Sequence, residues 1–118
     1  MTDRAVARAV PAPADVAGDP FEALGDANRR EILRLLGEGD KPVQELAGAM
    51  PISRPAVSRH LRLLKDAGLV EPVSDGTRRI YRVRPDGLSA LRAYMDELWR
   101  EASARYTLAA ENLTSEEP

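Results

Sequence analysis

The residues best suited to chemistry lie between Ser53 and Val70, in the segment SRPAVSRHLRLLKDAGLV. At 100° per residue, a helix would place one group of its side chains on a common arc: Arg54, Pro55, Ser58, Arg59 and Arg62. Arginine can donate two hydrogen bonds to guanine, and serine can bond a base or a phosphate. The pattern favours a helix that reads DNA. The alternative is a surface helix whose arginines are only solvated.

The same segment carries the signals of a helix with defined ends. Ser53 is suited to the N-cap position, because its hydroxyl can accept a backbone N–H that lacks an intrahelical partner. Pro55 falls in the first turn, where its missing N–H costs little, and Gly68 can end the helix. The apolar residues recur at helical spacing and predict one buried stripe: Val57, Leu61 and Leu64.

The charge is unevenly distributed along the 118 residues. Residues 1–52 carry 6 basic and 9 acidic side chains, and residues 85–118 carry 3 and 7. Residues 53–84 carry 8 basic and 3 acidic side chains, a local net charge of +5 in a chain whose total is −2. A basic middle between acidic ends indicates a localised surface for an anionic partner.

Composition predicts a single soluble domain. The chain is 43% hydrophobic and 31% charged, and no apolar run approaches the ~20 residues that span a bilayer. No secretory signal is visible at its start, so we expect no membrane association. With no cysteine, disulfides and thiolate metal sites are excluded, which fits a cytoplasmic location.

The sequence predicts a globular domain over residues 19–113 with a disordered arm at 1–18 and a disordered tail at 114–118. In the arm, Arg4 and Arg8 would either contact DNA phosphates or remain solvated, and the second is the more common state of residues at chain ends.

Three helices are expected before the DNA-reading helix. Asp19 can cap a short helix that starts at Pro20, and Asp26 can cap a second from Ala27 to Leu36. Pro42 opens a third, and Ser53 follows after a short link. Two helices joined by a tight turn, the second basic on its outer face, predict a helix-turn-helix.

A β-hairpin is expected next, with strands at Leu69–Val73 and Thr77–Val83 around an Asp75-Gly76 turn. Along the second strand the faces are mixed rather than cleanly apolar. The residues at its tip suit a wing that contacts phosphates or a minor groove: Thr77, Arg78 and Arg79. The alternative is a hairpin that only covers the core.

The last expected helix runs from Pro85 to about Asn112, and its apolar stripe is longer than a small core needs. A two-fold dimer is the commonest way to cover such a stripe. The predicted dimer interface comprises Phe21, Leu24, Leu91, Met95, Leu98, Trp99, Ala102 and Tyr106.

Taken together, the chain resembles the ArsR/SmtB-type winged-helix transcription regulators. The resemblance rests on Ala23-Leu24-Gly25-Asp26 with Arg29, Arg30, Ile32 and Leu33, on Val43–Leu46, on SRPAVSRHLRLLKDAGLV, and on Gly76–Tyr81. It covers roughly residues 20 to 105. It implies a mainly α fold with a small β-hairpin (α+β), a winged helix-turn-helix that dimerises through its first and last helices.

The resemblance also implies which residues face DNA. From the helix Ser53–Ala67 these are Ser53, Arg54, Ala56, Ser58, Arg59 and His60, to which the helical arc adds Pro55 and Arg62. The wing contributes Arg78 and Arg79, and Thr77 lies beside them.

The chain departs from the metal-sensing members of that family. Those carry Cys-x-Cys before the reading helix, or Asp, His and Glu ligands along the final helix. Here the first region reads Gln44-Glu45-Leu46-Ala47-Gly48, and the single imidazole of the chain is His60. Soft and borderline metals need thiolate or imidazole ligands, so we predict no metal and no cofactor, as in the metal-independent branch. The alternative is a hard cation bound by scattered carboxylates, for which the sequence has no motif.

Two residue types leave alternatives open. His60 suits a pH switch, but its place at the edge of the apolar stripe favours a packed or phosphate-contacting side chain. Trp99, Tyr94 and Tyr106 would line an effector pocket at the dimer seam, or simply pack there.

The sequence therefore predicts a homodimeric repressor that binds double-stranded DNA at an inverted repeat, with an effector left open. The alternative is a winged-helix protein-interaction module, which the basic middle segment disfavours. An enzyme is not expected, because no nucleophile–base pair, phosphate-binding glycine loop or metal cluster is visible.

Overall fold

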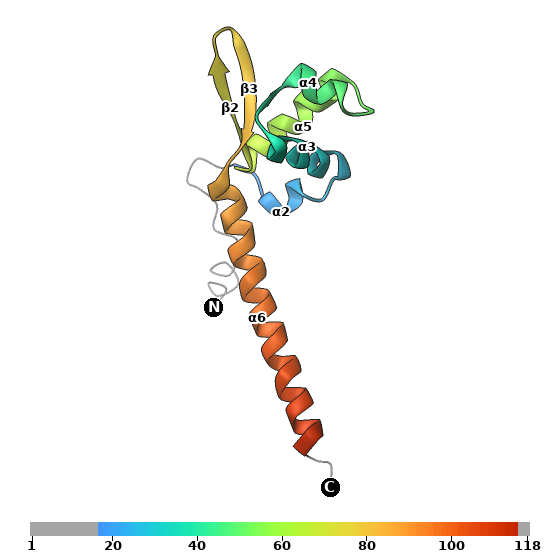
Figure 1. Ribbon diagram of the computed structural model, residues 1–118, viewed down its shortest axis with the longest axis vertical. Coiled ribbons are helices and arrows are strands. Elements are labelled where there is room, and N and C mark those ends of the chain that lie inside the picture. Colours follow the sequence, from blue (N-terminus) through green and yellow to red (C-terminus); the bar gives the residue numbers. More distant parts are fainter. Residues whose placement is uncertain (1–16, 116–118) are drawn as a thin grey trace.

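The computed structural model describes residues 17–115. The elements follow in the order α2 (Pro20–Ala23), α3 (Ala27–Glu38), β1 (Lys41–Pro42), α4 (Val43–Gly48), α5 (Arg54–Asp66), β2 (Val70–Asp75), β3 (Arg78–Val83) and α6 (Pro85–Ser115). Helices α2 to α5 cluster into one body. The β2–β3 hairpin projects from it, and α6 leaves it as a long rod (Figure 1). This is the predicted winged helix-turn-helix arrangement.

The two aspartates act as N-caps, as predicted. Asp19 Oδ1 accepts a hydrogen bond from the Phe21 N–H at 2.9 Å. Asp26 Oδ1 accepts from the N–H groups of Asn28 and Arg29 at 2.8 and 3.1 Å. Because these donors stabilise the ionised carboxylate, they lower the pKa of Asp26.

Helix α3 continues two residues past the predicted end at Leu36. Gly37 lies inside the helix and Gly39 is its C-cap. One glycine lowers helix stability by only about 1 kcal/mol relative to alanine, which the packing of α3 on the core offsets.

The core forms around α5, whose predicted stripe is completely buried. Val57, Leu61 and Leu64 each expose 0% of their surface. They pack with buried side chains of the other helices, of the connecting segments and of β2: Ala23, Ile32, Leu35, Leu36, Leu46, Met50, Ala67, Leu69 and Val70. This burial leaves α5 with one face toward the core and the other toward solvent.

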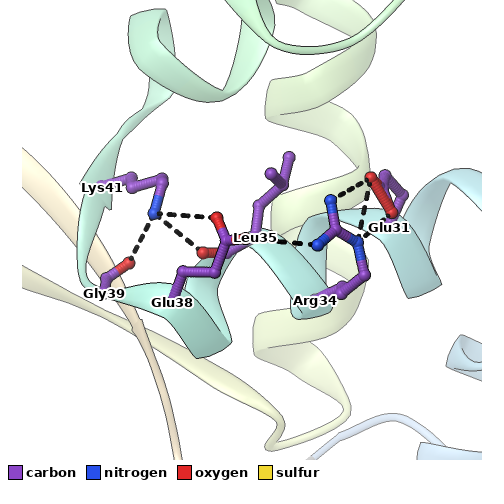
Figure 2. A network of polar contacts seen from close by, with 6 residues as sticks. All are labelled: Glu31, Arg34, Leu35, Glu38, Gly39 and Lys41. Atoms are coloured by element: carbon purple, nitrogen blue, oxygen red, sulfur yellow. Dashed lines mark hydrogen bonds and ion pairs between the residues drawn. The ribbon is translucent and has the colours of Figure 1, made fainter.

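The sheet has three antiparallel strands in the order β1-β3-β2. The sequence did not predict β1, which is only Lys41–Pro42 and pairs with Tyr81 and Ile80. Figure 2 shows how Lys41 secures it: Nζ donates to the carbonyls of Leu35 at 2.9 Å and Gly39 at 3.3 Å. Two-residue strands carry no alternation, so tertiary pairing alone reveals this one.

The hairpin turn lies one residue later than predicted. Asp75 pairs with Arg78, so the loop residues are Gly76 and Thr77 rather than Asp75 and Gly76. Gly76 takes the left-handed conformation, with φ of 63°. Tyr81 is buried at 9% exposure, so the mixed strand turns one aromatic ring onto the core.

Helix α6 touches the body only near its beginning. Leu91 is buried in the core, and the ring of Tyr94 meets that of Phe21 edge-on at 5.2 Å. Beyond this point the helix continues away from the body (Figure 1). Within residues 17–115, no helix combines the length and the apolar character needed to cross a membrane.

The structure also places the ends of the predicted domain. Ala17 and Gly18, assigned to the arm, donate their N–H groups to the Asp66 carbonyl at 3.0 and 2.7 Å. The rest of the arm, with Arg4 and Arg8, lies outside the described residues. Residues 114 and 115 belong to α6 rather than to the tail, and residues 116–118 are not described.

Candidate nucleic-acid interface

The solvent face of α5 presents the predicted arc. Ser53 caps the helix as expected, with its Oγ accepting from the Ala56 N–H at 3.3 Å. Ala56 is half-buried. The residues of the arc are all exposed: Arg54, Pro55, Ser58, Arg59 and Arg62. The buried stripe therefore turns these side chains outward, at the N-terminal and middle turns of the helix.

The arginines of residues 17–115 divide into two groups. One group bonds to the protein itself: Arg29 and Arg30 to backbone carbonyls, Arg34 to Glu31 and Glu38 (Figure 2), Arg82 to Glu71, Arg84 to Asp86, and Arg92 to Asp96. The other group makes no hydrogen bond or ion pair within those residues and comprises Arg54, Arg59 and Arg62 on α5, Arg78 and Arg79 on the hairpin, and Arg100 and Arg105 on α6. The unpaired guanidinium groups of α5 and the hairpin remain available to an anionic partner.

His60 differs from the expectation that it faces DNA. It is only 7% exposed, because it lies three residues after Val57 and beside Leu61, within the buried stripe. Its Nδ1 lies 3.5 Å from Nη1 of Arg29. The packed alternative is the one the structure shows, and His60 leaves the set of DNA-facing residues.

The tip of the hairpin carries the predicted wing. Thr77, Arg78 and Arg79 are exposed. The guanidinium carbon of Arg79 lies 5.9 Å from the centroid of the Tyr81 ring, a distance at which cation and ring attract. The wing thus presents one arginine supported by an aromatic ring and one without a partner.

The predicted dimer residues separate into buried and exposed ones. Leu91 is 6% exposed in the core of its own chain, so it is not free to contact a partner. Phe21 and Leu24 are half-buried against that core. Farther along α6, Met95, Leu98, Trp99 and Tyr106 are 49 to 79% exposed. Ala102 lies exposed between them.

Arg29 and Arg30 are positioning residues, a role that the sequence analysis, which named them only among the residues of the family resemblance, did not predict. Each reaches back to a carbonyl at the end of α2: Arg29 Nε to Ala23 and Arg30 Nη1 to Leu24, both at 2.7 Å. One signal was available. Two arginines in the first turn of α3 oppose the helix dipole, so a tertiary contact must hold them there.

No three histidine, cysteine, aspartate or glutamate side chains gather as a metal-binding group within residues 17–115.

Comparison with known proteins agrees with this geometry. Residues 26–72 match the model of the bacterial regulatory protein, arsR family. The HTH-type transcriptional regulator Rv2034 of Mycobacterium tuberculosis is 48% identical over 86 residues, 73% of this chain and 80% of that protein. The arsenical resistance operon repressor of Escherichia coli is 34% identical over 94 residues, 79% of this chain and 80% of the repressor.

A solved structure shows the same fold. It is the homodimeric winged helix-turn-helix DNA-binding domain of Mb0332 from Mycobacterium bovis, a possible ArsR-family transcriptional regulator, determined by NMR in solution. It superposes with a TM-score of 0.57 at 30% identity, over 84% of this chain and 82% of that one. With its winged helix-turn-helix and its basic α5 face, the chain belongs to the ArsR family of DNA-binding transcriptional regulators.

Proposed function

We propose that this regulator is a homodimeric repressor that sets α5 of each subunit into the major groove of an inverted-repeat operator. The observation that carries the proposal is the set of exposed, unpaired arginines on α5: Arg54, Arg59 and Arg62. Arginines near the beginning of a reading helix are placed to contact base edges. Ser53, Pro55 and Ser58 would lie along the same groove, and Thr77, Arg78 and Arg79 would contact the flanking phosphates or minor groove.

The dimer is supported by the exposed apolar side chains of α6 and by the Mycobacterium bovis relative, which is homodimeric. A two-fold dimer would place its reading helices in successive major grooves, about 34 Å apart. In our proposal the seam comprises Met95, Leu98, Trp99, Ala102 and Tyr106, with Phe21 and Leu24 at its edge.

Repression would follow because the dimer bound at the promoter blocks access of RNA polymerase. In our proposal this takes place in the cytoplasm. The Escherichia coli relative is a repressor. This chain has no cysteine and its one histidine is buried on the core-facing side of α5, so the proposal includes no thiolate or imidazole metal sensor.

A salt titration of DNA binding tests the proposal. Affinity for the DNA upstream of the protein's own gene would be compared with affinity for random DNA from low to physiological salt. We expect selective binding that weakens steeply as salt rises, because phosphate contacts release counterions. Equal, weak binding to both DNAs would contradict the assignment of that operator, and no binding at low salt would indicate a protein-interaction module.

Arg59→Ala is expected to weaken operator binding and to relax the preference at one base position. If Arg59 bonds guanine through both N–H groups, the loss is about 1–3 kcal/mol in binding free energy. Fluorescence anisotropy with operator variants substituted at single positions measures both effects. Arg100→Ala, which removes an exposed arginine of α6, is the matched control and should bind as the parent does. An Arg59→Ala protein with parental affinity and preference would remove Arg59 from the reading surface.

A further inference from the structure

Helix α2 contacts both the reading helix α5 and the long helix α6. Toward α6, Phe21 of α2 packs edge-on against Tyr94 at 5.2 Å. Toward α5, the Ala23 carbonyl at the end of α2 accepts the Nε–H of Arg29 at 2.7 Å. The same guanidinium then extends through Nη1 to Nδ1 of His60 in α5, at 3.5 Å. One side chain of α3 therefore connects the end of α2 with the reading helix.

The donor and the acceptor of the Arg29–His60 contact follow from the chemistry of the two side chains. Arginine carries only N–H donors, so a hydrogen bond between these two atoms requires Nδ1 of His60 to accept. The backbone of Arg29 is also fixed, because its N–H donates a hydrogen bond to Asp26 Oδ1 at 3.1 Å. His60 is the one polar side chain among the buried residues of the described chain. A directional contact in an otherwise apolar stripe can define helix rotation, which apolar packing alone defines poorly.

We propose that the Arg29–His60 contact is a positioning device that sets the rotation of α5 and so aims the neighbouring Arg59 at its base. His60 and Arg59 are adjacent on the helix, about 100° apart. A small rotation at His60 would therefore displace the guanidinium of Arg59 from the base edge. This inference rests on the proposed reading of DNA by α5.

The contact acts on selectivity rather than on folding. At 3.5 Å it is long for a hydrogen bond and adds little to the free energy of unfolding. Base readout demands closer alignment, since a bidentate pair tolerates only small displacements. Loss of the contact should therefore leave a folded protein that binds DNA phosphates normally and discriminates bases poorly.

Two substitutions of His60 separate the contact from simple packing. His60→Leu keeps an apolar side chain in the stripe but offers Arg29 no acceptor. His60→Asn can place its Oδ1 where Nδ1 stands, although it fills less of the core. We expect His60→Leu to reduce the ratio of operator to random-DNA affinity about threefold, because the loss of a weak contact can shift the orientation of α5 only by that contact's small free energy. His60→Asn should retain that ratio despite its poorer packing.

Arg29→Lys supplies the second variant. A lysine can donate to the Ala23 carbonyl but lacks the fork that reaches His60 at the same time. It should lower selectivity as His60→Leu does, and the double variant should lose no more than either single one, because both remove the same contact. Thermal unfolding and sedimentation mass, recorded for each variant, verify that fold and assembly are intact.

The outcomes separate this inference from the proposed function. If the parent selects its operator and folded His60→Leu does so equally well, the positioning role is wrong and the reading function stands. If His60→Asn loses selectivity as His60→Leu does, packing rather than hydrogen bonding is responsible, and the inference is again overturned. If the parent shows no selectivity for any promoter DNA, the proposed function fails and the inference fails with it.

Discussion

Replacing Gly87 by alanine is expected to destabilise the fold severely. A Cβ at this position would stand 2.0 Å from the carbonyl oxygen of Gly68 and 2.9 Å from its carbonyl carbon. Both are backbone atoms at the junction of α5 and β2, so no side chain can move aside. Overpacking typically costs 1–3 kcal/mol, and a collision between backbones should reach or exceed about 3 kcal/mol. For a domain of this size that lowers the melting temperature by roughly 15 °C.

Thermal denaturation followed by circular dichroism measures the loss. Gly37→Ala is the matched control, because Gly37 lies within α3 and no heavy atom lies within 4 Å of the added Cβ. Alanine is the better helix former, so this control should be as stable as the parent or slightly more so. A Gly87→Ala protein that melts with the parent would show that α6 does not approach Gly68 this closely.

The close approach at Gly87 has a consequence for the site. Three residues before Gly87, the Arg84 N–H donates a hydrogen bond to the Leu69 carbonyl at 2.8 Å. This bond attaches the beginning of α6 to the segment between α5 and β2. Gly68, with φ of 77°, makes the turn between α5 and β2. The helix proposed to form the dimer is therefore fastened at its beginning to the segment that follows the helix proposed to read DNA, so in the proposed dimer the seam would set the spacing of the two reading helices.

Features of the fold that depend on neighbours in sequence could be predicted. Asp19, Asp26 and Ser53 lie where caps are needed, and caps act within three residues. The buried stripe of α5 follows from helical periodicity, which also placed its arginines in solvent. For these elements the pattern of residues is itself the physical cause.

Features that depend on distant parts of the chain could not be predicted. Strand β1 exists because Lys41 and Pro42 meet β3, about forty residues away. Gly87 carries no local signal, since its requirement arises from the carbonyl of Gly68. His60 lies at the edge of the helical stripe, which favoured a packed side chain, but its partner Arg29 on α3 is 31 residues away and carries no local signal. Of the residues predicted to face DNA, His60 is buried and Ala56 is half-buried, and the others are exposed.

Trp99→Ala is expected to weaken the dimer by about three orders of magnitude. In the single chain Trp99 is 73% exposed and Tyr106 is 79% exposed. Together with Ala102 they border a hollow on α6 that a side chain of a second copy can fill. Tryptophans at the centre of an interface typically contribute about 2 kcal/mol or more each. A two-fold seam loses the contact twice, so the expected loss is about 4 kcal/mol.

Sedimentation over a range of protein concentrations tests this placement, because the variant should dissociate where the parent remains dimeric. Arg100→Ala is the neighbouring control, since Arg100 is exposed and lies about 100° farther around the helix, away from the apolar stripe. Folding of the monomer should not change, as Trp99 contacts little within its own chain. Operator affinity should fall together with dimer mass, because each monomer then binds a half-site alone. If the dimer survives and the affinity is unchanged, the seam lies elsewhere, and the exposed aromatic rings of α6 serve another partner.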